Sequence, residues 1–197
     1  MLYRTMQKTG ERLSILGFGC MRLPQKRGRI DADRASGQIR SAVDRGVNYL
    51  DTAIPYHLGA SEPFLGRALA DGYRERVHLA TKLPPGAART RPEMDRVLAA
   101  QLDRLRTGHI DYYLLHGLNG ESWDAMEHLG VCEFLDTAKA DGRIRFAGFS
   151  FHGDPDAFKR IVDAYDLEFC QIQYNYLDEQ VQAGTEGCGT PPQEGWA

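Results

Sequence analysis

Six short apolar segments, each followed by an amphipathic segment, constrain the fold of this chain more than any other feature. They begin roughly every 30 residues, which is the length of a βα unit. The strands expected from them span residues 13–20, 47–53, 77–82, 110–116, 145–150 and 168–173. Right-handed crossovers lay such strands down in order. The pattern therefore predicts an α/β fold with a parallel sheet.

Helix boundaries follow from capping residues. A helix is expected over residues 31–45, with Gly46 ending it. Ser61 is the expected N-cap of a second helix, and Thr90 and Glu93 form an expected capping box at the start of a third. Asp154 and Pro155 open a further helix. Residues 2–13 read as a hairpin that could plug one end of a barrel.

The number of strands decides between two architectures. An open doubly wound sheet would need a glycine-rich phosphate loop, but Gly17-Phe18-Gly19 lacks the third glycine. A closed (β/α)8 barrel needs eight strands and about 250 residues. We therefore expect a TIM-type barrel truncated to about six βα units over residues 1–187. Residues 188–197 lose helical periodicity and are expected to be an aberrant tail, produced by a frameshift or a premature stop.

Composition excludes several function classes. The chain has 42% hydrophobic and 26% charged residues, so it can bury a core. Its 24 Lys and Arg are outnumbered by 27 Asp and Glu, which argues against a nucleic acid or an anionic membrane as partner. No apolar leader or membrane span is visible, and we expect a cytoplasmic protein. The four cysteines lack metal-site spacing and are expected to be reduced structural thiols.

Four polar residues lie at or just past the ends of three successive expected strands: Asp51, Tyr56, Lys82 and His116. A parallel βα repeat brings all carboxyl ends of the strands to one face. Each residue alone has a simpler explanation, such as a turn cap for Asp51, loop packing for Tyr56 or a core hydrogen bond for His116. Their joint placement predicts a shared pocket.

These side chains form a proton-transfer set for carbonyl chemistry. Reduction by hydride builds negative charge on the carbonyl oxygen, and Tyr56 can donate a proton there. A nearby Lys82 ammonium is expected to lower the pKa of Tyr56, and Asp51 to hold Lys82 charged and oriented. His116 could orient the carbonyl oxygen or share the proton transfer.

Four segments resemble the signatures of the aldo-keto reductases: GVNYLDTA at 46–53, YHLGASE at 56–62, LATK at 79–82 and DYYLLH at 111–116. The resemblance runs in order from about residue 13 to residue 187. It implies a TIM barrel, NADPH as the usual hydride donor and a small-molecule carbonyl substrate. It also implies that Asp51, Tyr56, Lys82 and His116 form the catalytic tetrad.

The resemblance also implies that Ser150 and Gln171 contact the amide of the nicotinamide. Phe151 occupies the position where the family usually has an Asn. The sequences of residues 149–152 and 173–176 are similar to those of a bacterial branch of the family, whose members often have a C-terminal ferredoxin-like region with 4Fe-4S motifs. No such motif occurs in this chain. The family holds the cofactor phosphates with loops after strands seven and eight, and we expect neither strand here.

Two other readings stay open. The chain could be an inactive or regulatory barrel fragment that binds a nicotinamide cofactor or a partner without turnover. A metal-dependent barrel hydrolase using His116, His152 and Asp51 is disfavoured, because the first strand lacks a His-x-His pair. An open barrel also leaves two strand edges, through which self-association is possible.

Overall fold

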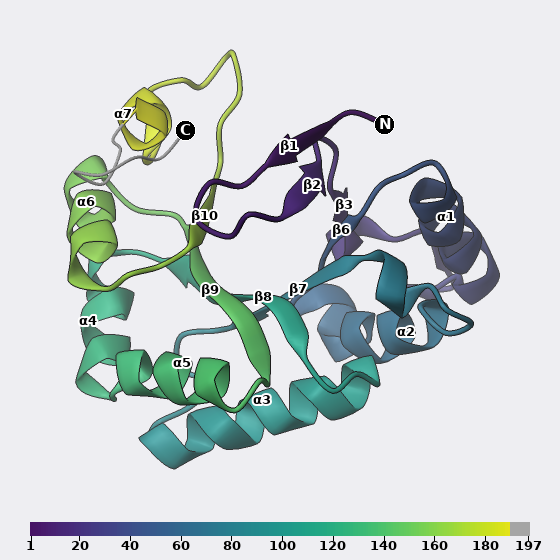
Figure 1. Ribbon diagram of the computed structural model, residues 1–197, viewed down its shortest axis with the longest axis horizontal. Helices are drawn as coiled ribbons and strands as arrows, with labels where there is room; N and C mark the ends of the chain where they lie inside the picture. The colour runs from purple at the N-terminus through teal and green to yellow at the C-terminus, as the bar shows by residue number, and fades with distance from the viewer. Residues whose placement is uncertain (190–197) are drawn as a thin grey trace.

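A curled parallel sheet forms the centre of the molecule in the computed structural model, which describes residues 1–189. The strands pair in sequence order, so each new strand joins the edge left by the previous one (Figure 1). Their bounds are β3 (Phe18–Gly19), β6 (Tyr49–Asp51), β7 (His78–Leu83), β8 (Ile110–Leu118), β9 (Ile144–Phe151) and β10 (Phe169–Ile172). The sheet is a half-barrel of six strands, which confirms the expected truncated TIM-type fold.

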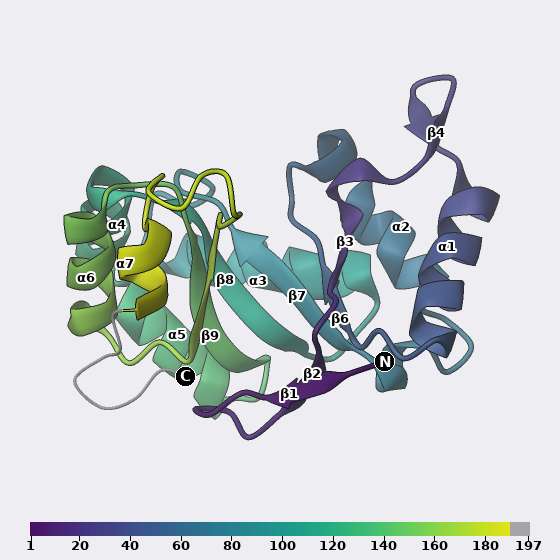
Figure 2. The ribbon, with the colours of Figure 1, turned by 90° about the horizontal axis from the view of Figure 1, so that it is seen from above.

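Helices follow the strands and pack outside the curve of the sheet (Figures 1 and 2). They are α1 (Ala32–Asp44), α2 (Ser61–Ala68), α3 (Arg91–Leu105), α4 (Gly120–His128), α5 (Val131–Ala140), α6 (Pro155–Ala164) and α7 (Gly184–Gly189). Short 3-10 turns occur at η1 (Cys20–Arg22), η2 (Tyr56–Gly59) and η3 (Arg74–Arg76). Among residues 1–189, no helix combines the length and the apolar character needed to cross a bilayer.

The predicted boundary between barrel and tail, at residues 187 and 188, falls inside α7. The remainder of the predicted tail, residues 190–197, lies outside the described residues.

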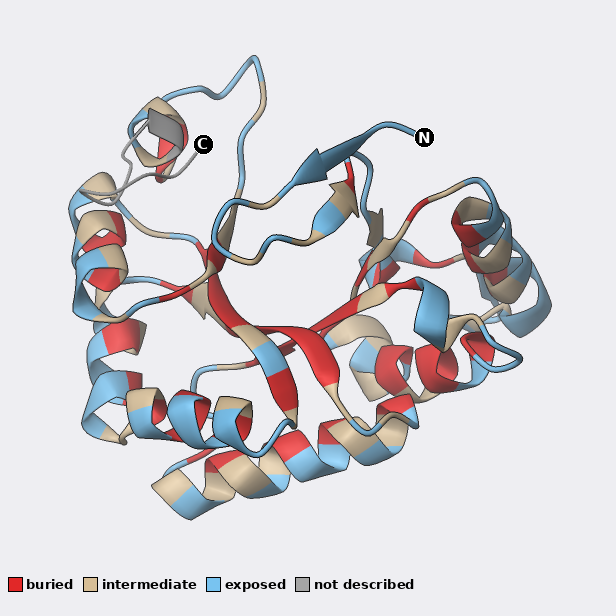
Figure 3. Cartoon of the chain, viewed as in Figure 1, coloured by how far each residue is buried: buried red, intermediate tan, exposed pale blue. Residues whose placement is uncertain are grey.

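Two apolar clusters lie on opposite faces of the sheet. The larger fills the space between strands and helices and includes Leu79, Leu115, Phe134 and Ile161, all fully buried. Figure 3 shows the buried residues along β7 to β9 and on the helix faces turned toward them. The smaller cluster lies inside the curve, where Tyr112 and Phe169 cross edge to face at 4.8 Å between ring centroids. Side chains therefore fill the inside of the half-barrel below its mouth, which is the open end where the carboxyl ends of the strands lie.

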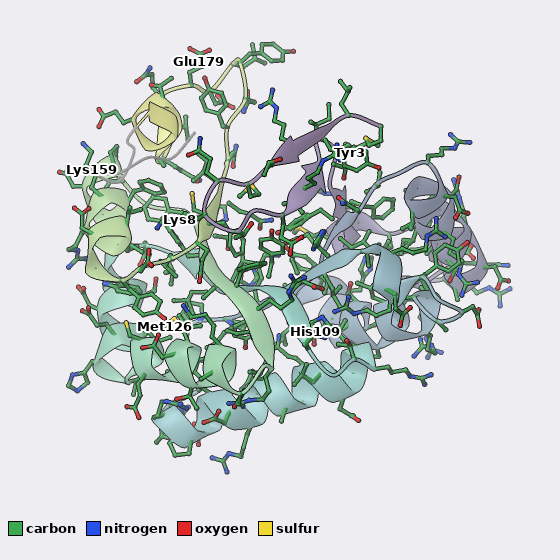
Figure 4. The ribbon with its side chains drawn as sticks, viewed as in Figure 1. Tyr3, Lys8, His109, Met126, Lys159 and Glu179 are labelled. Atoms are coloured by element: carbon green, nitrogen blue, oxygen red, sulfur yellow. The ribbon has the colours of Figure 1, made fainter. Side chains whose placement is uncertain are left out.

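The expected N-terminal hairpin is present as β1 (Tyr3–Thr5) and β2 (Arg12–Ser14), and it covers the end of the half-barrel where the strands begin. Lys8, labelled in Figure 4 near β10, donates to Asp166 at 2.7 Å and to the Leu167 carbonyl at 3.0 Å. On the opposite side, the Tyr3 hydroxyl donates to the Gly46 carbonyl at 2.9 Å. These contacts close the lower end and leave the carboxyl ends of the strands open.

Three local expectations are corrected by tertiary contacts. The strand expected over residues 13–20 is divided, because its start pairs in β2 and only Phe18–Gly19 joins the sheet. Ser61 is not an N-cap; Ala60 holds that position, and the Ser61 hydroxyl bonds to Thr52 at 2.8 Å. Glu93 accepts the Arg89 N–H instead of closing a capping box with Thr90.

Replacing Gly66 in α2 with alanine is expected to destabilise the protein, because α2 crosses the end of α3 without room for a side chain. An added Cβ would lie 2.5 Å from the Arg104 carbonyl oxygen and 2.8 Å from the Leu105 carbonyl carbon. These are backbone atoms, so the helices must separate. We expect a loss of about 1 to 3 kcal/mol in the free energy of unfolding, measured by urea denaturation.

Gly37→Ala is the matched control for this prediction. Gly37 also lies within a helix, α1, but apart from its chain neighbours and the backbone of α1 itself no atom lies within 4 Å of its added Cβ. Alanine has the higher helix propensity, so this change is expected to stabilise the protein by up to about 1 kcal/mol. Equal effects of the two substitutions would contradict the close approach of α2 and α3.

Candidate active site

The predicted tetrad residues come together at the open end of the half-barrel. Asp51 ends β6, Lys82 lies near the end of β7, and His116 lies near the end of β8. Tyr56 begins η2, the turn that leads from β6 to α2. Three strands and one turn thus bring four distant residues to one face, as the parallel topology requires.

Lys82 lies at the centre of this group and forms hydrogen bonds with two of its other members. Its Nζ atom donates to Asp51 Oδ2 at 2.6 Å, to the Thr52 carbonyl at 2.9 Å and to Tyr56 Oη at 3.4 Å. Lys82 is only 2% exposed, so its charge is compensated by these oxygens rather than by water. The predicted role of Asp51 in orienting Lys82 agrees with this geometry.

Tyr56 is held by a turn of unusual backbone conformation. The next residues, His57 and Leu58, have φ values of 52° and 54°, and Gly59 follows at 89°. Two adjacent non-glycine residues in the left-handed region cost free energy and persist only where surrounding contacts hold them. His57 supplies one such contact, because its Nε2 accepts the Leu23 N–H at 3.1 Å.

Burial sets the proton affinity of both Tyr56 and Lys82. It raises the pKa of Tyr56 to about 12, with the Asp51 carboxylate adding to the effect. This corrects the expectation that the pKa of Tyr56 is lowered: burial and the negative charge of Asp51 both disfavour the phenolate. Burial also lowers the pKa of Lys82, against the opposing effect of Asp51. At neutral pH Tyr56 is therefore a protonated phenol.

His116 faces Tyr56 across the mouth. The two rings are 6.1 Å apart between centroids and nearly perpendicular. Burial, followed by the charge of Lys82 and by His152, lowers the pKa of His116 to about 4. His116 is therefore neutral at pH 7, and a neutral imidazole can donate one hydrogen bond to an oxygen in the mouth.

Ser150 and Gln171 are neighbours in register on β9 and β10. The Ser150 hydroxyl accepts the Gly117 N–H at 2.8 Å, and Gln171 Nε2 donates to the Tyr49 hydroxyl at 2.9 Å across the interior. Each side chain keeps hydrogen-bonding capacity beyond these bonds. An amide beside a hydroxyl fits a planar carboxamide such as that of nicotinamide, so this pair suits the cofactor group that the resemblance implies.

Sequence reasoning missed two members of the site. The Thr52 carbonyl holds Lys82, and no sequence pattern marks a backbone acceptor of this kind. The Tyr49 hydroxyl accepts a hydrogen bond from Gln171. Its position could have been predicted from strand alternation, since Tyr49 lies two residues before Asp51 on the same face of β6.

The metal-site alternative involved His152, which is close to Gln182, with its Nδ1 3.2 Å from Gln182 Oε1. In the part of the chain that the structure describes, no three or more His, Cys, Asp or Glu side chains are grouped so that they could hold a metal ion.

Comparison with known proteins gives consistent matches. A sequence model of the aldo/keto reductase family matches residues 15–186. Aldo-keto reductase YhdN of Bacillus subtilis is 32% identical over 199 residues, which cover 92% of this chain and 56% of the relative.

Solved structures agree with this match. The holo form of aldo-keto reductase AKR11C1 from Bacillus halodurans superposes with a TM-score of 0.75 and 30% identity, over 88% of this chain and 58% of that one. An aldo-keto reductase from Klebsiella pneumoniae, solved in complex with NADPH, gives a TM-score of 0.68 and 26% identity, over 89% of this chain and 59% of that one. The chain spans about half the length of the curated relatives it matches.

Proposed function

Because this chain belongs to the aldo/keto reductase family, we propose that it is an NADPH-dependent oxidoreductase that reduces small aldehydes or ketones to alcohols. The observation that carries this proposal is the convergence of Asp51, Tyr56 and Lys82, joined by hydrogen bonds of 2.6 Å and 3.4 Å to one buried Nζ atom. Such a set supports proton transfer to a carbonyl oxygen at the mouth.

In this proposal Tyr56 is the general acid. Its pKa of about 12 keeps the phenol protonated at neutral pH, so a proton is available when negative charge develops on the carbonyl oxygen. Lys82 then stabilises the phenolate left behind, since its ammonium lies 3.4 Å from Tyr56 Oη. Neutral His116 donates a hydrogen bond to the same carbonyl oxygen and orients it.

Ser150 and Gln171 would hold the carboxamide of the cofactor, which supplies the hydride when bound. The choice of NADPH rests on the Klebsiella pneumoniae relative solved with that cofactor. β3 and β10 each pair with one neighbour among the described strands, and self-association through these two edges is part of the same proposal. The cytoplasmic location and the division of the chain at residue 187 stay predictions.

Replacing Tyr56 with phenylalanine is expected to lower carbonyl-dependent NADPH oxidation by about a hundredfold or more, because the proton donor is lost while the ring remains. The rate is followed by NADPH absorbance, and NADPH affinity by its fluorescence on binding. Affinity is expected to stay unchanged, since Tyr56 is not among the proposed carboxamide contacts.

Tyr165→Phe is the matched control, because this phenol donates to Asp136 at 2.5 Å on the outer layer of helices. It is expected to leave turnover unchanged. Equal turnover of the Tyr56→Phe variant and the unmodified chain would refute the role of Tyr56. NADPH binding without any turnover in the unmodified chain would instead favour the regulatory fragment.

A further inference from the structure

A cavity of about 530 Å³ lies beside the mouth, outside the half-barrel. One wall is the short hairpin of β4 (Gln25–Lys26) and β5 (Arg29–Ile30), which projects above α1 and α2 in Figure 2. The other wall is formed by η2 and the first turns of α2. A volume of this size accommodates a small organic molecule.

The charge of this cavity is opposite to that of the chain. Arg29 and Arg67 line it, and no Asp or Glu is among its lining residues, although the whole chain has a net charge of -3. Both arginines are exposed, and within residues 1–189 neither guanidinium has a hydrogen bond or an ion pair. Two guanidinium groups with free donors at one cavity favour an anion, and their planar fork matches a carboxylate.

The cavity also has apolar lining residues. Ile30, Leu58 and Phe64 line the same cavity. Leu58 is fully exposed, and its left-handed backbone holds a large apolar side chain in solvent at a strained position. Strain of this kind is concentrated at functional sites. An apolar group in the cavity would cover Leu58 and remove it from water.

His57 fixes the two walls relative to each other. Its Nε2 accepts the Leu23 N–H at 3.1 Å, and its Nδ1 lies 3.2 Å from the side-chain amide of Gln25 at the start of the hairpin. The cavity is therefore preformed between the hairpin and the turn that carries Tyr56, which reduces the ordering cost of binding.

We propose that this cavity binds a small amphipathic carboxylate, with the carboxylate on Arg29 and Arg67 and the apolar body against Leu58 and Phe64. This site is separate from the mouth that contains Lys82, and the proposal does not depend on turnover. The ligand class follows from the pairing of unpartnered guanidinium groups with an apolar wall.

Titration of the full chain with benzoate, followed by amide NMR shifts, tests this site. Saturable shifts are expected in residues 28–30 and 58–67. Arg29→Gln and Arg67→Gln are each expected to weaken binding by about tenfold, as the loss of a charge-assisted hydrogen bond would. Both side chains are unpartnered, so the variants are expected to fold, which their circular dichroism checks. Benzamide, which has the same ring without the charge, is expected to bind at least about tenfold more weakly.

Lys26→Gln is the matched control, since Lys26 is a cation of the same hairpin that does not line the cavity. Its affinity for benzoate is expected to be unchanged. The proposal is overturned if Lys26→Gln weakens binding as much as Arg29→Gln does, because the hairpin would then attract benzoate by its overall positive charge rather than through specific contacts. Equal affinity for benzamide, shifts confined to residues around Lys82, or no saturable shift at all would overturn it as well.

Discussion

Replacing Asp51 with asparagine is expected to lower the free energy of unfolding by about 3 kcal/mol at pH 7. Lys82 is 2% exposed, and its Nζ lies 2.6 Å from the Asp51 carboxylate. Asparagine preserves the shape of the side chain but removes the charge, so a buried ammonium is left without its counter-charge. Urea denaturation of the variant and the unmodified chain measures the loss.

This loss is expected to depend on pH. The pKa of Lys82 in the folded chain is already lowered by burial, and removing Asp51 lowers it further. In both chains there is a pH range below about 10.5 in which the unfolded state holds the Lys82 proton and the folded state has released it. In the Asp51→Asn variant this range extends to lower pH. Stability rises with pH inside that range, because the unfolded state holds more protons there. The deficit of the variant should therefore shrink between pH 7 and pH 9.5.

Two controls separate the buried pair from ordinary surface charge. Asp71→Asn removes a carboxylate whose side chain is 75% exposed and which pairs with Arg40, and it is expected to cost at most about 1 kcal/mol. The double variant Asp51→Asn with Lys82→Met removes both charges and should recover most of the loss. If the double variant loses as much free energy of unfolding as the two single substitutions lose together, the two residues are not coupled.

Glu62→Gln is expected to lower the free energy of unfolding by about 3 to 5 kcal/mol, because Glu62 accepts hydrogen bonds from three side chains while only 1% exposed. Thr81 on β7 donates at 2.7 Å, Gln101 on α3 at 2.9 Å and Arg104 on α3 at 2.7 Å. Glutamine has nearly the same volume but one acceptor oxygen, so its amide N–H groups would face donors. The loss therefore measures hydrogen bonding rather than a cavity.

Thermal denaturation followed by circular dichroism measures this effect. Glu93→Gln is the matched control, because Glu93 also accepts an arginine and a backbone N–H, but at the surface. It is expected to cost at most about 1 kcal/mol. A Glu62→Gln variant as stable as the control would mean that the buried network contributes little.

Features encoded within a few residues were predictable from the sequence. Asp154 caps α6 as expected, since its side chain accepts the Ala157 N–H at 2.9 Å. The strand ends that hold Asp51 and Lys82 were also predictable, because the alternation of apolar and amphipathic segments determines which face the carboxyl ends share. Both predictions depend on periodicity and local capping alone.

Features created by distant contacts were not predictable. Ser61 resembles a cap, but its hydroxyl lies beside Thr52 and donates to the Cys20 carbonyl, 41 residues away in sequence. The pKa of Tyr56 was predicted in the wrong direction, because desolvation depends on how deeply η2 packs, and residue types do not specify that depth. The grouping of the four side chains was predictable, but their electrostatic balance was not.

The N-terminal hairpin has a consequence for the order in which the chain folds. Its side chains reach Gly46, Tyr112 and Leu167, so its contacts span up to 159 residues of sequence. Contacts of such long sequence separation form slowly, and the bond to Asp166 cannot form before Asp166 has been synthesised. The hairpin is thus synthesised well before it can acquire all of its native contacts. Until then, the lower end of the half-barrel and the aromatic residues inside it stay uncovered.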